Sequence, residues 1–312
     1  VLASRECEHR GLAGDRIGAI SGARVLDFTP DARLPWRSMV HLLEAGPAAI
    51  DQARTVLAEA EAGTGQAEWL ALDSVTLGPP VPGARKLFAL AGNYAEHIQE
   101  SIKHAGISQA PRVFMKPPST VLRGDGAPIT LHRYARGVDW EAELAVVIGA
   151  RARYVDRADA LGYVAGYSCF NDVSERKFQV FPRERRTEWD GFFDWLNGKW
   201  VDGFGPMGPA LVTPEEVGDP QDLDISLTVN GTVQQSANTR QMIFDVATII
   251  EFLSAFCTLE PGDIIATGTP AGVGDAKGVY LSAGDTVQVR IQRVGTLTNP
   301  VVAEAPSDGS AG

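Results

Sequence analysis

The pattern of apolar and polar positions predicts many short strands along most of the chain. Residues 225–229 alternate apolar with polar side chains, and Asn230 and Gly231 follow as a two-residue hairpin turn. Residues 138–149 are rich in β-branched side chains and end at a glycine, which predicts another strand. Further strands are expected at residues 87–90, 113–115, 263–269 and 287–291.

Two segments have the period of a helix instead. Residues 242–257 repeat apolar side chains three and four positions apart, which predicts an amphipathic helix. Residues 47–62 are rich in Ala and Glu, begin with a proline and stop at Gly63, which predicts a second helix. Because helices are few among many strands, we expect an α+β chain that is mostly β.

A run of glycines and prolines at residues 78–83 is the strongest break in the pattern, since it suits neither a helix interior nor a central strand. We therefore predict a small N-terminal accessory region over residues 1–78, with a hairpin at residues 17–26, and a β-rich catalytic domain over 84–304. Residues 305–312 are rich in Ser, Gly and Asp and are predicted to be a disordered tail.

Composition narrows the class of partner. The chain has 312 residues and a net charge of −11, which argues against nucleic acid and anionic membrane surfaces as partners. Cys7, Cys169 and Cys257 fit no disulfide framework or zinc motif, so a cytoplasmic location is expected. No apolar run approaches the roughly 18 residues of a membrane span, and the charged N-terminus lacks the apolar segment of a signal peptide.

Three carboxylates form the first candidate site. Glu141 and Glu143 are two positions apart in a predicted strand, so both side chains point to the same face. Two like charges beside an apolar run cost stability, and a cation would remove that cost. Asp172 supplies a third carboxylate, and an oxygen-only set favours Mg²⁺, Mn²⁺ or Ca²⁺. The alternative is a solvated strand face with an aspartate in a nearby turn.

Two further groups could carry chemistry. His97 and Glu100 would be neighbours on one helix face, where Glu100 could orient His97 as a base. Lys116 and Lys199 lie in Gly-, Pro- or Trp-rich settings, where a lysine could meet a substrate carboxylate or oxyanion. The alternatives are an exposed helical pair and surface lysines. The glycine-rich residues 266–274 lack the ending of a phosphate loop, which leaves a pocket wall or a structural turn.

These pieces, in this order, resemble the fumarylacetoacetate hydrolase family over about residues 86–302. The resemblance rests on Gly92-Asn93-Tyr94…His97, Phe114-Met115-Lys116-Pro117, Glu141-x-Glu143-Leu144, Gly166-Tyr167…Asn171-Asp172-Val173-Ser174-x-Arg176, Gly198-Lys199…Gly205-Pro206 and the segment from Asp263 to Gly274. It implies a mixed β-sandwich or β-roll core, a variable N-terminal region and a homodimer.

The resemblance also implies roles for residues. Glu141, Glu143 and Asp172 would bind Mg²⁺ or Mn²⁺, with Ca²⁺ possible in their place. His97 and Glu100 would activate water, and Lys199 would stabilise an oxyanion. Lys116, Gln179 and Thr269 would be substrate-pocket positions.

The implied activity is a metal-dependent hydrolase that cleaves a C–C bond in an acylpyruvate- or fumarylacetoacetate-like substrate through a metal-bound enolate. Alternatives are a decarboxylase or isomerase of 2-oxo diacids (oxaloacetate or 2-oxohept-3-enedioate type), a dehydratase or hydrolase of deoxy sugar acids, and a non-catalytic metal-binding protein. In each catalytic case the partner is a small anionic 2-oxo acid.

Residues 180–197 are longer and more aromatic than the corresponding link in many members of the family. We hypothesise that this segment shapes the pocket or a dimer contact, and that Arg183, Arg185 or Arg186 binds a distal carboxylate. The alternative is a surface loop whose arginines pair with Glu184 and Glu188.

Overall fold

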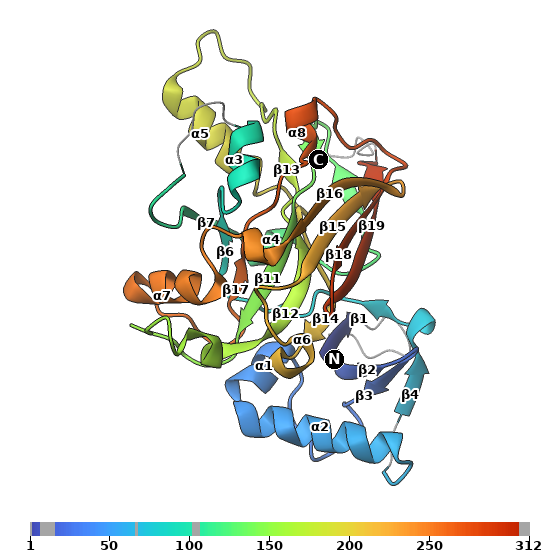
Figure 1. The fold of residues 1–312 in the computed structure, drawn as a ribbon. Helices are drawn as coiled ribbons and strands as arrows, with labels where there is room; N and C mark the ends of the chain where they lie inside the picture. Colours follow the sequence, from blue (N-terminus) through green and yellow to red (C-terminus); the bar gives the residue numbers. More distant parts are fainter. Residues whose placement is uncertain (1, 7–15, 66–67, 102–106, 306–312) are drawn as a thin grey trace, which may run out of the picture.

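The structure is a computed structural model that describes residues 2–6, 16–65, 68–101 and 107–305 (Figure 1). Cys7 and, apart from Ala305, the predicted tail lie outside this part of the chain. Among the described residues, Cys169 and Cys257 are both free thiols. None of the helices in the described part of the chain has the length and apolar character that a membrane span needs.

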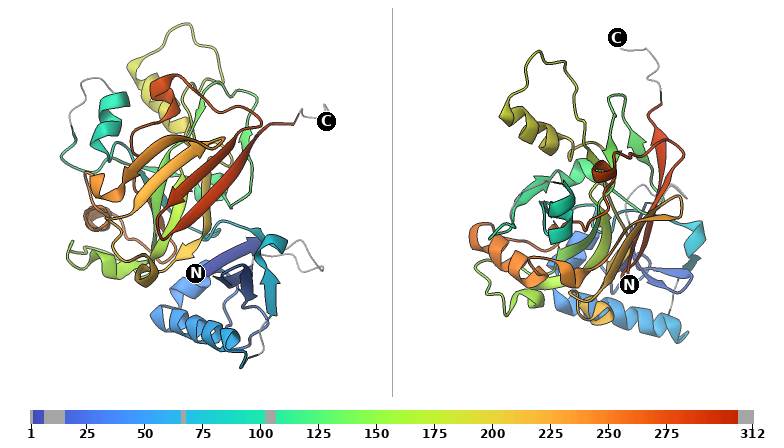
Figure 2. Two further views of the ribbon diagram at one scale, coloured as in Figure 1. Left: turned by 45° about the vertical axis from the view of Figure 1, so that its right-hand side comes forward. Right: turned by 45° about the horizontal axis from the view of Figure 1, so that its top comes forward.

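Strands dominate the fold and form two large sheets (Figures 1 and 2). The first has the order β4-β3-β2-β1-β14-β12-β11-β17-β6-β7, with β5 paired to β1 and β8 paired to β14. Its strands are β1 (Leu2–Glu6), β2 (Arg16–Ser21), β3 (Arg24–Asp27), β4 (Glu68–Ala71), β5 (Thr76–Leu77), β6 (Leu87–Leu90), β7 (Val113–Lys116), β8 (Leu122–Arg123), β11 (Ala142–Ile148), β12 (Val164–Asn171), β14 (Gly205–Val212) and β17 (Ile264–Ala266).

The second sheet has the order β16-β15-β18-β19-β9, and β10 pairs with β13 separately. These strands are β9 (Ile129–Leu131), β10 (Val138–Asp139), β13 (Ser174–Glu175), β15 (Asp224–Val229), β16 (Thr232–Asn238), β18 (Thr286–Ile291) and β19 (Gly295–Ala303). Asn230 and Gly231 both have positive φ between β15 and β16, which confirms the predicted hairpin turn.

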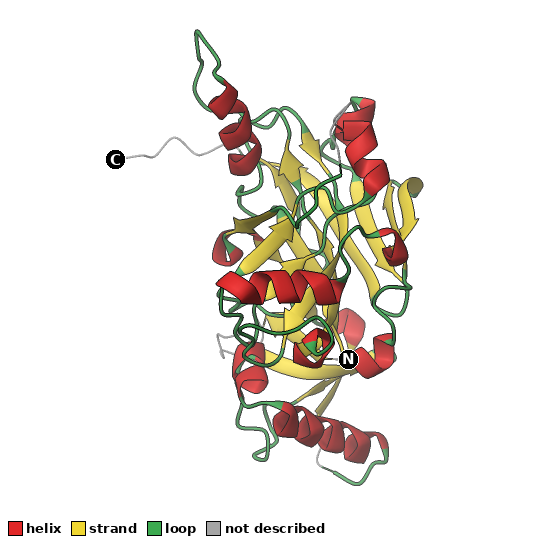
Figure 3. Cartoon of the chain, turned by 60° about the vertical axis from the view of Figure 1, so that its left-hand side comes forward, coloured by secondary structure: helices red, strands yellow, loops and turns green. Residues whose placement is uncertain are grey.

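Short helices surround the sheets (Figure 3). They are α1 (Met39–Glu44), α2 (Pro47–Glu61), α3 (Ala95–Ser101), α4 (Pro118–Val121), α5 (Glu188–Asn197), α6 (Pro214–Val217), α7 (Val246–Phe256) and α8 (Gly274–Lys277), with 3₁₀ turns η1 (Leu72–Ser74), η2 (Ala160–Tyr163) and η3 (Thr239–Gln241). The predicted α+β, mostly β fold with a sandwich-like core is confirmed.

Strand β11 explains how the core is divided. Its alternate side chains Leu144 and Val146 join the cluster that also holds Leu227 and Val289 of the second sheet. Ala145, on the opposite face, belongs to a cluster that includes the N-terminal helices. A strand covered on both faces must be apolar throughout, which accounts for the continuous run of residues 144–148.

The N-terminal region continues the first sheet, because β1 pairs with β14 through Leu2 and Leu211. The predicted hairpin is β2 and β3, and the predicted helix over 47–62 is α2, which packs below the sheet in Figure 1. One apolar cluster contains Leu42 from α1 and Val147 from β11, so the accessory region and the rest share a core. Residues 78–83 form a loop. That this loop marks the limit of a domain stays a prediction.

Three element predictions were wrong in detail. The strand predicted over residues 263–269 is shorter, because β17 ends at Ala266 before the turn at Gly268, where φ is +92°. Helix α7 begins at Val246 rather than Met242, because the Asp245 side chain caps it by accepting from the Thr248 amide at 2.7 Å. The strand predicted over residues 138–149 is interrupted between β10 and β11. There the Trp140 amide donates to Asp139 at 2.8 Å and the Glu141 amide donates to Asn171 Oδ1 at 2.9 Å, so side chains replace ladder partners.

Candidate metal centre and active site

Three carboxylates meet at the ends of β11 and β12. One ligand oxygen each from Glu141, Glu143 and Asp172 lies within 4.8 Å of the others, and all three residues are buried. The pairing of Ala142 with Asn171 places Asp172 beside the start of β11. The Asp172 amide also donates to the Glu141 carbonyl at 2.9 Å, which fixes the two side chains in register.

Buried cations surround two of these carboxylates. Lys199 Nζ lies 2.7 Å from Glu141 Oε2 and 2.6 Å from Asp172 Oδ2. Burial disfavours the charged amine, but the attraction of Asp172 and Glu141 outweighs burial and raises the pKa of Lys199. Arg176 pairs with Glu141 and, at 2.9 Å, with Asp139. Burial opposes ionisation of Glu141, but Lys199 and Arg176 lower its pKa.

Glu143 is different from the other two carboxylates. Its Oε2 accepts from the Gly268 amide at 2.7 Å, whereas its buried Oε1 has no hydrogen-bond partner among the described residues. Burial and the neighbouring Asp172 and Glu141 raise the pKa of Glu143 well above its ordinary value. The three carboxylates offer only oxygen ligands, and one of these oxygens has no hydrogen-bond partner among the described residues. Such a set fits a hard divalent cation. A bound cation would offset the free-energy cost of keeping the buried Glu143 carboxylate ionised.

Gly268 is required at this position. Its φ is +92°, and a Cβ there would lie 2.8 Å from the Cβ of Asn93. Asn93 itself is buried and donates to Thr267 O at 2.8 Å and to Phe244 O at 3.0 Å. The turn after β17 is therefore held close to the start of α3, with its amide directed at Glu143.

The predicted pair of His97 and Glu100 is formed on α3. His97 Nδ1 lies 3.2 Å from Glu100 Oε1, and Glu100 also accepts from the Gly272 amide at 2.8 Å. Burial opposes ionisation of Glu100, but the hydrogen bonds from His97 and Gly272 lower its pKa. A charged Glu100 fixed in this way would orient the imidazole of His97.

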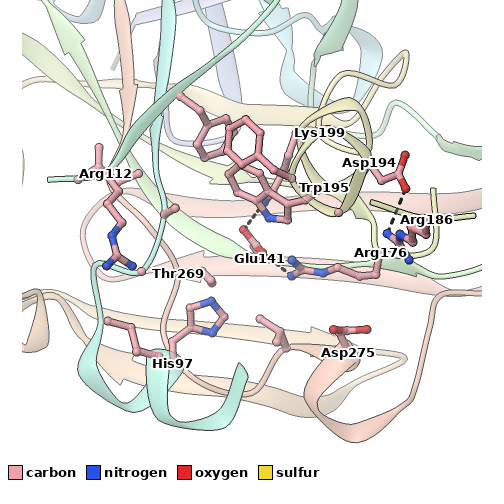
Figure 4. Close-up of a pocket in the computed structure, with 18 residues that line it drawn as sticks. His97, Arg112, Glu141, Arg176, Arg186, Asp194, Trp195, Lys199, Thr269 and Asp275 are labelled. Atoms are coloured by element: carbon pink, nitrogen blue, oxygen red, sulfur yellow. Dashed lines mark hydrogen bonds and ion pairs between the residues drawn. The ribbon is translucent and has the colours of Figure 1, made fainter. Parts of the chain in front are cut away.

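A cavity of about 470 Å³ is lined in part by Glu141 and Lys199 (Figure 4). Its volume is within the usual range for small-molecule sites. The lining residues are Leu90, Ala91, Gly92, His97, Ile98, Arg112, Phe114, Glu141, Arg176, Arg186, Gly191, Phe192, Asp194, Trp195, Lys199, Thr269, Val273 and Asp275. His97, Glu141 and Lys199 thus share one cavity, as a catalytic site requires.

The three predicted substrate-pocket positions lie in different places. Thr269 lines the cavity and accepts from Gln235 at 2.8 Å. Lys116 is fully buried beneath it, where it pairs with Asp172 and donates to Phe204 O at 2.7 Å, so it supports Asp172 from below. Gln179 lines a neighbouring cavity instead, together with Arg136.

The segment over residues 180–197 forms a loop and helix α5, which projects beside α3 (Figure 1). The predicted alternative pairing with Glu184 and Glu188 was wrong. Asp194 is the partner instead: it accepts two bonds from Arg183, at 2.6 and 2.8 Å, and one from Arg186 at 3.0 Å. Asp194 is buried whereas Glu184 and Glu188 are exposed, and a buried carboxylate attracts a guanidinium group more strongly than an exposed one.

Sequence reasoning missed two kinds of site residue. Arg176 stood in a recognised motif, four positions after Asp172, but received no role. Gln235 lies far away in the sequence, yet it accepts from the Ala142 amide at 2.9 Å and donates to Pro270 O at 2.7 Å. Gln235 thereby ties the start of β11 to the turn that carries Thr269. Arg112 of the cavity wall was also missed, since it has no motif of its own.

Comparisons with known proteins identify the family of this chain. The family model described as fumarylacetoacetate (FAA) hydrolase C-terminal matches residues 86–302. The chain is 46% identical over 227 residues to the 2,4-didehydro-3-deoxy-L-rhamnonate hydrolase of Sphingomonas sp. (strain SKA58), covering 72% of this chain and 75% of that protein. It is 40% identical over 296 residues to the mitochondrial oxaloacetate tautomerase FAHD2A of Bos taurus, covering 93% and 88%.

A solved structure gives the same result at the level of the fold. The crystal structure of maleylpyruvate hydrolase from Sphingobium sp. SYK-6, in complex with manganese(II) and pyruvate, superposes with a TM-score of 0.75 at 32% identity. That match covers 98% of this chain and all of the other. The chain therefore belongs to the fumarylacetoacetate hydrolase family.

Proposed function

We propose that this protein is a divalent-cation-dependent hydrolase that cleaves the C–C bond of an acylpyruvate, a 2,4-dioxo acid. The observation that carries the proposal is a cavity lined by His97, Glu141 and Lys199. Glu141 belongs to the carboxylate triad, and His97 is paired with Glu100. The names of two relatives support it, since both are hydrolases and one was solved with manganese(II) and pyruvate. Mg²⁺ or Mn²⁺ is the proposed cofactor.

The balanced reaction is R–CO–CH₂–CO–COO⁻ + H₂O → R–COO⁻ + CH₃–CO–COO⁻ + H⁺. Glu141, Glu143 and Asp172 would hold the cation, which when bound supplies positive charge that stabilises an enolate. His97 would accept the proton of the attacking water, and Glu100 would stabilise the imidazolium that results. The proton is then delivered to the methylene carbon as the pyruvate product forms.

Lys199 would stabilise the developing oxyanion. Its ammonium group lies 5.5 Å from the centre of the Phe114 ring and 5.9 Å from that of Trp195, in a site largely shielded from water. A charged donor held in such surroundings interacts more strongly with a new negative charge than it would in water. Arg176 would hold Glu141 in place on the opposite side.

The second candidate is a tautomerase that interconverts the keto and enol forms of a 2-oxo diacid. It is favoured by the 40% identity to an oxaloacetate tautomerase, which extends over 93% of this chain. Tautomerisation needs proton transfer at carbon but no attack by water. The same carboxylates and His97 could serve it, so geometry alone does not separate the two reactions.

The separating experiment measures pyruvate release and enol absorbance in parallel with Mn²⁺ present. Acetylpyruvate, fumarylpyruvate and oxaloacetate are the substrates, and an EDTA-treated sample is the control. The proposal expects stoichiometric pyruvate and carboxylic acid from an acylpyruvate. Rapid loss of enol oxaloacetate without cleavage of either acylpyruvate would favour the tautomerase. Metal binding with no turnover of any substrate would support the non-catalytic alternative.

A further inference from the structure

Arg112 is a cation in the cavity wall that has no carboxylate partner in the part of the chain that the structure describes. The other lysine and arginines of the wall are each held by acids. Lys199 pairs with Glu141 and Asp172, Arg176 with Asp139 and Glu141, and Arg186 with Asp194. An uncompensated guanidinium facing a cavity, in a chain of net charge −11, is a ready partner for an anion.

The backbone at Arg112 is firmly placed even though its side chain is exposed. Its carbonyl accepts from the Ala91 amide at 2.9 Å, which continues the pairing of β6 with β7. Arg112 therefore lies next to Gly92 and the start of α3, on the same side of the cavity as His97. The position is set by the sheet, and only the side chain needs to become ordered when an anion binds.

Arg112 and Arg186 lie on opposite sides of the close-up, with Glu141 and Lys199 between them (Figure 4). Arg186 is the less suitable anion partner, because Asp194 already accepts bonds from Arg186 and Arg183. Drawing Arg186 away would leave the buried Asp194 with less compensation. Arg112 can bind an anion without breaking any such pair.

The wall between these ends is aromatic. Phe114 and Trp195 contact each other edge to face, with ring centres 4.9 Å apart, and Phe192 lies 6.0 Å from Trp195. Rings of this kind favour a flat, apolar group beside them. A ligand anchored at the carboxylate triad would thus pass along an apolar surface before it reached Arg112.

We propose that Arg112 is the residue that binds the distal carboxylate of a 2-oxo dicarboxylic substrate, so that Arg112 determines the preference for such a substrate over a 2-oxo monocarboxylic acid of the same chain length. This inference rests on the proposed function for the 2-oxo acid end only. It assigns the binding of a distal carboxylate to Arg112, just before strand β7, in place of the loop arginines of residues 183–186.

The test is a binding measurement that needs no turnover. Calorimetry with Mn²⁺ present compares 2-oxoadipate with 2-oxohexanoate, which have the same chain length and differ in a terminal carboxylate or methyl group. The wild-type protein is expected to bind the dicarboxylate more tightly by about 10- to 100-fold, as for a charged hydrogen bond. Arg112→Gln is expected to bring that ratio close to one, and Arg112→Lys to retain part of it.

Two matched variants make the result specific. Arg186→Gln removes the cation at the opposite end, and Arg85→Gln removes a surface arginine that pairs with Glu44; both should retain most of the preference. The inference is overturned if the wild type shows no preference, if Arg112→Gln retains it, or if Arg186→Gln loses it. A preference that depends on Arg112 in a protein that releases no pyruvate would instead reject the proposed hydrolysis and leave this inference standing.

Discussion

The carboxylate floor and the cavity rim are built in different ways. The floor, defined as Glu141, Glu143 and Asp172, lies at the ends of paired strands and is buried. The rim, defined as α3, α5 and Arg112, consists of short helices and a strand end, and Trp189 of α5 is 71% exposed. The floor cannot move without disturbing the sheet, whereas the rim can change at little cost to the core.

This difference suggests that the floor and the rim have separate functions. Rigid strands fix the oxygens that would bind a cation, where small displacements are costly. Under the proposed function, the rim would supply the base and the groups that select the far end of the substrate. Substitutions in the floor should therefore reduce both metal binding and activity. Substitutions in the rim should reduce activity and leave metal binding unchanged.

The largest effects are expected within the floor itself. Asp172→Asn should reduce activity by more than the roughly 10- to 100-fold typical of a lost group around a metal ligand. It should also lower the unfolding free energy of the metal-free protein by about 3 kcal/mol, because buried Lys116 and Lys199 lose a counter-charge. Urea unfolding in EDTA and initial rates with Mn²⁺ measure the two effects. An active Asp172→Asn protein would contradict the assignment.

His97→Ala tests the rim against the floor. It should lower kcat for hydrolysis by about 10²- to 10⁴-fold, the usual contribution of a general base. Its Mn²⁺ affinity should stay that of the wild type, because His97 is separate from the carboxylate triad. Glu96→Gln, on the exposed side of the same helix, is the control and should change neither quantity. Loss of Mn²⁺ binding in His97→Ala would show that rim and floor are not separable.

Gly272→Ala examines how the rim is attached. Gly272 has φ +106°, and a Cβ there would lie 2.1 Å from the Gln234 carbonyl. We expect a loss of roughly 3 kcal/mol in unfolding free energy, together with reduced activity, because the Gly272 amide holds Glu100. Gly231→Ala, at φ +76° with nothing within 4 Å, isolates the backbone strain and should cost roughly 1 kcal/mol. Equal losses would mean that the contact with Gln234 is unimportant.

The smallest effect is expected at Asp194 on α5. Asp194→Asn weakens the bonds from Arg183 and Arg186, and should lower the unfolding free energy by about 1 kcal/mol. KM should rise modestly while kcat is retained, since Asp194 lines the cavity at a distance from the triad. Steady-state kinetics and thermal unfolding check both parts. A fall in kcat comparable with that of His97→Ala would place α5 in the catalytic step.

The floor could be predicted from sequence because its signal is local. Strand alternation places Glu141 and Glu143 on one face, and the apolar residues that follow them indicate that the strand is buried. The break at Trp140 could not be predicted, since it depends on Asn171 accepting the Glu141 amide from another strand. Lys116 was expected in the substrate pocket and lies beneath Asp172, because sequence does not reveal on which side of a carboxylate a buried lysine approaches.

The rim was less predictable because its contacts are long-range. Arg183 and Arg186 lie in the loop before α5 and both donate to Asp194 on that helix. The contact depends on how the loop folds back on the helix, which sequence does not show. Arg112 is distinguished by having no carboxylate partner among the described residues, and no sequence pattern predicts that. The homodimer, the cytoplasmic location and the domain limit near residue 78 stay predictions.

The central claim is that the floor binds a divalent cation, and Mn²⁺ titration calorimetry on the wild type and Glu143→Gln tests it most directly. Glu143 makes no ion pair among the described residues, so this substitution should leave the metal-free protein at least as stable as the wild type, by urea unfolding. We predict one Mn²⁺ per chain for the wild type and at least about 100-fold weaker binding for Glu143→Gln. Equal Mn²⁺ affinity in the two proteins, or no binding to the wild type, would contradict the account.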